Sequence, residues 1–234
     1  IGTGYRENRE LELFGTAHLL ALLVGAVFGL LCIVFRRRGC VWPVALLALL
    51  NLSAYGFNQW VYESFDFEIP LDNLLPFHLC DVAALLAGFA LLTKKPLIRE
   101  LCFCWGLAGT LQALITPNLP YPFPHPIFFT FFTHHGVVVI TALFLPLAEG
   151  WRPRPGTFPR LLLWNQVYFI SVMAVNWTAD TNFGFLMEKP HGATIFDHLG
   201  PWPSYLIWLQ LIAAAFIALF LLPFSKRINV WRFR

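Results

Sequence analysis

Seven long apolar segments alternate along the chain with short stretches that are rich in charged residues, proline or glycine. A helix rises 1.5 Å per residue, so 23 residues reach about 34 Å, which is enough to cross the hydrocarbon core of a bilayer. The strands of a membrane barrel would instead show alternating segments of about ten residues. The pattern predicts an all-α, polytopic membrane protein with seven transmembrane helices in a single domain over residues 1–234. The predicted spans lie at residues 13–35, 40–62, 76–93, 97–116, 127–148, 159–179 and 202–224.

The composition supports the same class of protein. Of the 234 residues, 58% are hydrophobic and only 12% are charged, whereas soluble domains carry about 25% charged residues. This excludes a soluble enzyme, a disordered chain and a small disulfide scaffold. The chain starts at Ile1 and shows no basic segment followed by a cleavage site, so we expect the first span to insert into the membrane as it stands.

The basic residues gather at alternate ends of the spans. Of the 16 lysine and arginine residues, 13 lie beside the loops after the first, third and fifth spans or in the C-terminal tail. The positive-inside rule places these loops in the cytoplasm, so the N-terminus is expected outside and the C-terminus inside. The net charge of +3 therefore reflects the orientation of the chain in the membrane and does not indicate a nucleic-acid partner. The basic loops are also suited to binding anionic lipid head groups.

Polar side chains inside the spans are the candidates for function, because polar groups are costly in hydrocarbon. Nearly all of them fall in the outer halves of the spans, and several recur at helical spacing on one face, as Asn51, Tyr55 and Asn58 do. This distribution predicts a polar cavity that opens toward the outer leaflet. Interhelical hydrogen bonds that only fix the packing are the alternative. The candidate lining residues are His18, Asn51, Tyr55, Asn58, His78, Asp81, Trp105, Gln112 and Asn176.

Cys80 is the only one of the five cysteines in the outer halves. It lies near the start of the third span, where the helix dipole favours a thiolate. His134 and His135 of the fifth span lie at a compatible depth and are candidate bases for a cysteine nucleophile. A buried cysteine without a reactive role is the alternative.

A metal site is a second alternative, because the same region offers imidazole and carboxylate groups that suit zinc or iron. No single span has the His-x-x-x-His or Glu-x-x-His spacing that places two ligands on one helix face. We therefore predict no metal and no cofactor.

Four runs carry a resemblance to a known family, namely residues 75–81, 105–113, 131–136 and 199–203. With these runs the chain resembles, over roughly residues 15–220, the bacterial YwaF-like integral membrane proteins, which are grouped with the animal transmembrane protein 164. The resemblance implies a multi-span α-helical protein. The animal relative is an acyltransferase that remodels ether phospholipids through a cysteine, and more distant androgen-induced hydrolases of lipid esters use a threonine and a histidine. Carried over by position, Cys80 matches the nucleophile and His135 the base, with His134 as the second choice.

These observations together predict a membrane-embedded lipid acyltransferase or lipid-ester hydrolase in the cell membrane, which is the bacterial plasma membrane if the resemblance holds. Its partner is a membrane phospholipid or another acyl lipid. A small-solute or ion transporter and a metal-binding or ligand-binding membrane protein are the alternatives. The oligomeric state does not follow from the sequence.

Overall fold

The structure is a computed structural model that describes residues 11–65, 74–119, 121–190 and 195–225. Every regular element within these ranges is helical, which confirms the all-α prediction. Residues 66–73 of the acidic loop and the basic tail at 226–234 lie outside the described residues. The elements are α1 (Thr16–Arg37), α2 (Trp42–Ser64), α4 (Leu79–Thr93), α5 (Pro96–Trp105), η1 (Gly106–Thr110), α6 (Leu111–Ile115), α7 (Pro126–Leu147), α8 (Thr157–Ala179), η2 (Phe183–Phe185), η3 (Ile195–Leu199) and α9 (Ser204–Ser225).

Six of the predicted spans form helices of 20 to 23 residues that are apolar enough to cross a membrane, which confirms a multi-pass membrane protein. Proline stands in the first turn of α2, α5 and α7, where its fixed φ suits a helix start and its missing N–H costs no hydrogen bond. His125 precedes α7, and its Nδ1 accepts a hydrogen bond from the backbone N–H of Ile127 at 3.2 Å.

The third predicted span differs from the other six. It forms the 15-residue helix α4, which begins at Leu79 rather than at residue 76. At 1.5 Å per residue this helix is about 22 Å long, so it is shorter than the hydrocarbon core. The described residues therefore contain six helices of spanning length and one shorter apolar helix, where the sequence predicts seven spans of which the third is already the shortest.

The fourth span contains a π-helical turn, η1, between α5 and α6. Two of its glycines meet neighbouring helices closely. A Cβ atom on Gly109 would lie 2.5 Å from Leu79 Cδ2, and one on Gly106 would lie 3.0 Å from the Cβ of Ala142. A π-turn inside an α-helix often marks a functional site, and here it lies against the start of α4.

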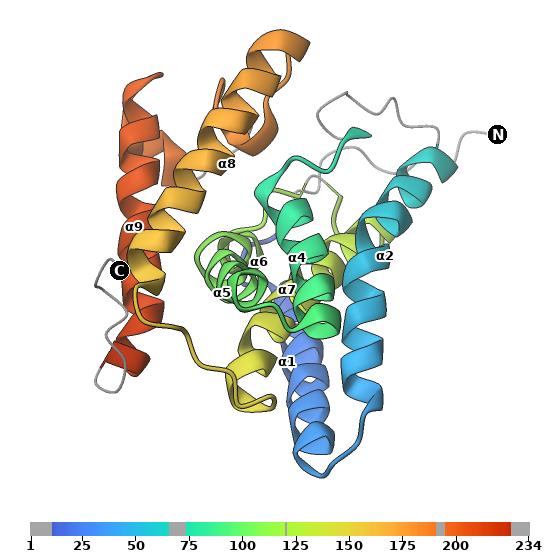
Figure 1. The fold of residues 1–234 in the computed structure, drawn as a ribbon. Helices are drawn as coiled ribbons and strands as arrows, with labels where there is room; N and C mark the ends of the chain where they lie inside the picture. Colours follow the sequence, from blue (N-terminus) through green and yellow to red (C-terminus); the bar gives the residue numbers. More distant parts are fainter. Residues whose placement is uncertain (1–10, 66–73, 120, 191–194, 226–234) are drawn as a thin grey trace, which may run out of the picture.

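The core of the molecule lies between α4, the α5–η1 segment and α7. These helices supply most of the main buried cluster, which includes Ala84, Ala87, Trp105, Val138 and Ala142. Figure 1 shows α2 on one side of this centre and α8 and α9 on the other. Most of the α7 span is buried inside the protein, whereas only 17% of the α1 and α8 spans and 22% of the α9 span are buried. Exposed apolar helices around a buried centre suit a lipid environment.

Candidate functional site

The first turn of α4 carries the predicted nucleophile. Cys80 is partly buried, and Asp81 beside it is 8% exposed. The backbone carbonyl of His78 accepts hydrogen bonds from the N–H groups of Asp81 and Val82, each at 3.1 Å, and so begins the helix. An acidic residue in a first turn interacts favourably with the helix dipole.

Two histidines of α7 face this turn. His134 Nε2 lies 3.6 Å from Asp81 Oδ1 and has no hydrogen-bond partner. The same imidazole ring lies against the backbone of Cys80. The structure therefore brings His134 to Cys80 and Asp81, although these two residues precede it by 54 and 53 positions in the sequence.

His135 is held in one tautomer by the backbone of its own helix. Its Nδ1 lies 2.8 Å from the carbonyl oxygen of Phe131. A carbonyl oxygen only accepts hydrogen bonds, so Nδ1 carries the proton and Nε2 of the neutral ring keeps a lone pair. The ring centroid lies 4.2 Å from that of Phe131, with the two rings tilted by 34°, and 5.2 Å from that of His134. His135 thus has the protonation pattern that a general base requires.

The loop after α8 folds over the start of α4. The N–H of Gly184 donates to His78 Nδ1 at 3.2 Å, and the rings of Phe183 and Phe185 lie 5.4 and 5.6 Å from the His78 ring. Tyr168 of α8 donates its hydroxyl to the carbonyl of Phe77 at 2.9 Å. The role of Tyr168 could not be predicted, because its partner Phe77 lies 91 residues away in the sequence.

Asn176 is the side chain that holds this loop. It is 1% exposed. Its Nδ2 donates to the carbonyl of Phe183 at 3.0 Å, and its Oδ1 accepts from the Phe183 N–H at 2.8 Å and from the Thr181 hydroxyl at 3.0 Å. Asn176 therefore fixes the loop over His78 through its hydrogen bonds to Phe183 and Thr181.

Several other candidate lining residues make interhelical or local hydrogen bonds. His18 is fully buried, accepts from the Phe14 N–H, and bonds the carbonyl of Leu114 at 2.8 Å. Asn51 is also fully buried and donates to Thr141 Oγ1 at 2.9 Å, which joins α2 to α7. For these two residues the packing alternative describes the contacts that the structure shows. Trp105 donates to Asn165 at 2.7 Å, Tyr55 donates to the carbonyl of Leu74, and Asn58 and Gln112 are partly exposed on α2 and α6.

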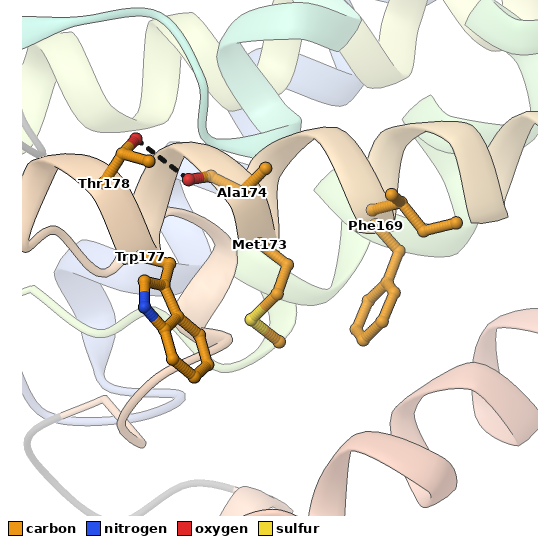
Figure 2. A pocket seen from close by; sticks show the side chains of 6 residues that line it. Phe169, Met173, Ala174, Trp177 and Thr178 are labelled. Carbon is orange, nitrogen blue, oxygen red and sulfur yellow. Dashed lines mark hydrogen bonds between the residues drawn. The ribbon is translucent and has the colours of Figure 1, made fainter.

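Two hollows on the described surface lie away from Cys80. One, of about 390 Å³, runs along α8, where Phe169, Met173 and Trp177 project to the same side of the helix (Figure 2). The other, of about 470 Å³, is lined by residues 187–190 together with Asp197, Trp202 and Tyr205. The polar cavity that the sequence predicts around Cys80 is not either of these hollows. No group of three His, Cys, Asp or Glu residues within the described ranges is placed to hold a metal ion.

At the opposite end of the helices, two carboxylates each lie between two arginines. Glu100 of α5 is fully buried and bonds Arg154 and Arg160. Glu149 bonds Arg36 and lies 3.6 Å from Arg99 Nη2. The hydrogen bonds to Glu100 raise the pKa of Arg154 above its usual value. Sequence reasoning assigned these residues to topology alone, because the loops that bring them together are far apart in the chain.

The comparison with known protein families gives one assignment. The TMEM164 family matches residues 13–221. The chain belongs to the TMEM164 family. The match to the TMEM164 family includes α4 and α7, and so covers Cys80, Asp81, His134 and His135. Neither a curated protein nor a solved structure matched the chain.

Proposed function

We propose that this TMEM164-family chain is a lipid acyltransferase or lipid-ester hydrolase that uses Cys80 as its nucleophile. The observation that carries the proposal is the contact of His134 on α7 with Asp81 and the Cys80 backbone on α4, with the His135 ring 5.2 Å from that of His134. A thiol beside imidazole groups at the start of a helix is the arrangement that nucleophilic catalysis by cysteine requires.

The reaction has two halves. His135 Nε2 takes the proton of the Cys80 thiol as the sulfur attacks the carbonyl carbon of a lipid ester, and a C–S bond forms. The ester C–O bond then breaks, and the imidazolium returns the proton to the leaving alcohol. In the second half a lipid hydroxyl or water attacks the carbonyl carbon of the thioester while His135 Nε2 takes its proton. A C–O bond forms, the C–S bond breaks, and the imidazolium gives this proton to the thiolate sulfur. Atoms and charge balance over the cycle without a cofactor.

The surroundings of Cys80 have supporting roles in this proposal. The Phe131 carbonyl keeps His135 in the tautomer with a free Nε2 lone pair. His134, which lies between Asp81 and the Cys80 backbone, is the second candidate for the base. The oxyanion of the tetrahedral intermediate would be stabilised by Asn58, Gln112 or backbone N–H groups at the start of α4.

The proposed substrate and the orientation of the protein both follow from its place in a membrane. The substrate is a phospholipid or another acyl lipid whose tails reach Cys80 sideways between helices. The N-terminus lies outside the cell and the C-terminus in the cytoplasm, as the 13 basic residues on one side predict. The protein belongs to the YwaF-like branch and lies in a bacterial plasma membrane.

The test uses an acyl-ester activity probe on the purified full chain in detergent, with the adduct located by mass spectrometry. We expect an acyl adduct on Cys80 in the native chain and none in Cys80→Ala. Cys40→Ala is the matched control, because Cys40 is a partly buried cysteine at the far end of α1 and should leave labelling unchanged.

The two histidine variants then separate the bases. His135→Ala is expected to slow labelling by about 10²- to 10⁴-fold, the range typical of a lost general base, and His134→Ala to slow it less. Full acyl transfer by Cys80→Ala, or an adduct that stays when Cys80 is replaced, would overturn the proposal.

A further inference from the structure

Two arginine–carboxylate–arginine triads lie at the end of the helices that carries the basic loops. The first triad is Arg36, Glu149 and Arg99, and the second triad is Arg154, Glu100 and Arg160. Arginine is always protonated in proteins. Each triad therefore contains two positive charges and one negative charge, and each carries a surplus of one positive charge.

The second triad is arranged so that the carboxylate is hidden and the arginines are not. Glu100 has a fully buried side chain, whereas the side chains of Arg154 and Arg160 are 42% and 29% exposed. Both oxygens of Glu100 are occupied, since Arg154 bonds them at 2.9 Å and Arg160 at 2.8 and 3.0 Å. The Thr157 hydroxyl adds a bond at 2.7 Å. The surplus charge thus lies on the exposed edges of the two guanidinium groups.

The exposed edges have donors to spare. A guanidinium has five N–H donors. Arg154 directs Nε and Nη2 to Glu100, and Arg160 directs Nη1 to Glu100 and Nη2 to the carbonyl of Pro155. Arg154 Nη1 and Arg160 Nε are therefore directed neither to Glu100 nor to Pro155. Two neighbouring guanidinium groups with remaining donors match the oxygens of a phosphate.

The position of the second triad suits a lipid head group. Glu100 is the fifth residue of α5, and Arg160 is the fourth residue of α8, so the triad lies within about 8 Å of both helix ends. Every other described acidic residue except Glu149 lies toward the opposite end, whereas Arg37, Arg38, Lys94, Lys95 and Arg152 lie at this one.

We propose that the exposed edge of the second triad binds the phosphate of an anionic phospholipid head group. A zwitterionic head group also contains a phosphate, but its ammonium group cancels the charge, whereas an anionic lipid supplies the one negative charge that the triad lacks. Buried Glu100 then has two roles, since it holds both arginines in place and limits their surplus charge. The inference does not depend on the reaction proposed at Cys80.

The test measures lipid binding to the full-length protein in detergent by native mass spectrometry, with phosphatidylglycerol and phosphatidylcholine of the same acyl chains as probes. The native chain is expected to retain phosphatidylglycerol preferentially. Arg160→Gln removes the surplus charge and is expected to lower that preference by about fivefold, the effect of one basic residue near an anionic surface. Lys94→Gln is the control, because Lys94 is an exposed basic residue at the same end that belongs to neither triad. It should change the preference by less than twofold.

Glu100→Gln separates binding from folding. This variant raises the surplus to two positive charges, so the preference for phosphatidylglycerol should increase even though the thermal stability falls. A triad that serves only the fold predicts lower stability with no gain in lipid preference, and that result would overturn the proposal. An equal loss in Lys94→Gln and Arg160→Gln would also overturn it, because it would indicate diffuse attraction. Measuring the variants in a Cys80→Ala background keeps the outcome separate from acyl transfer.

Discussion

Replacing Asn176 is expected to release the loop over α4. In Asn176→Ala, the buried N–H and carbonyl of Phe183 lose the side chain that satisfies both of them. The Thr181 hydroxyl loses its acceptor as well. Phe183 has no exposed surface in the folded protein, so water reaches its backbone only when the loop opens.

The magnitude follows from the number of buried groups left without partners. An unsatisfied buried donor or acceptor costs about 1 to 3 kcal/mol. Two such groups on Phe183 predict that the free energy of loop opening falls by about 2 kcal/mol or more. Each 1.4 kcal/mol is a factor of ten, so the amide of Phe183 should exchange its hydrogen roughly 30-fold faster or more.

Hydrogen exchange followed by mass spectrometry on peptides from residues 176–190 measures this effect. Thr178→Ala is the matched control, because Thr178 is exposed on the same helix and its hydroxyl bonds only carbonyls of its own helix, as Figure 2 shows for Ala174. It should leave exchange in the loop unchanged. Equal exchange at Phe183 in native protein and Asn176→Ala would refute the assignment of Asn176 as the residue that holds the loop.

Two further predictions concern packing and pH. Gly88→Ala places a Cβ 2.5 Å from Leu52 Cγ, where α2 packs on α4, and should lower the free energy of unfolding by about 1 to 3 kcal/mol, measured by thermal unfolding. Gly25→Ala is the control, because nothing lies within 4 Å of its new Cβ, and it should not destabilise the protein. Similar melting temperatures for both variants would contradict the close packing at Gly88. Burial lowers the pKa of His125 in the folded protein. As the pH falls, this histidine therefore becomes protonated in the unfolded chain before it does in the folded protein, and the free energy of unfolding should decrease below about pH 6.5. His125→Asn keeps a side-chain acceptor at the start of α7 without a titrating group, and a melting temperature that is no less pH-dependent in this variant would rule out His125 as the source.

The helices of this protein were predictable because span length and charge patterning are local properties of the chain. The predicted segments and the observed helices differ by at most three residues at any boundary. The third span, for example, is predicted to begin at residue 76, and α4 begins at Leu79. The shortness of α4 was not predictable, because Pro76, Phe77 and His78 continue the apolar pattern although they form turns. The π-turn at Gly106–Thr110 also leaves the hydropathy pattern unchanged.

The candidate site was predictable in part. Depth along a span placed Cys80, Asp81, His134 and His135 at one level, and the structure brings His134 to Asp81 and to the Cys80 backbone. Depth does not tell which neighbour a side chain meets. His18 and Asn51 share that kind of position but bond Leu114 and Thr141 instead. The contact of the loop at residues 180–186 with His78 and the hydrogen bonds of buried Glu100 escaped prediction for the same reason, since these partners are distant in sequence.

The short helix α4 imposes a requirement on its neighbours. A helix about 22 Å long leaves roughly 8 Å of bilayer thickness to irregular backbone, and such backbone persists at membrane depth only where protein groups replace water as partners. Tyr168 bonds the carbonyl of Phe77, Asn176 bonds both backbone groups of Phe183, and Tyr205 bonds the carbonyl of Phe185. Side chains of α8 and α9 thus hydrogen-bond the backbone of Phe77 before α4 and of the loop that covers His78. The short α4 therefore depends on these three side chains, which take the place of water for the irregular backbone around its start.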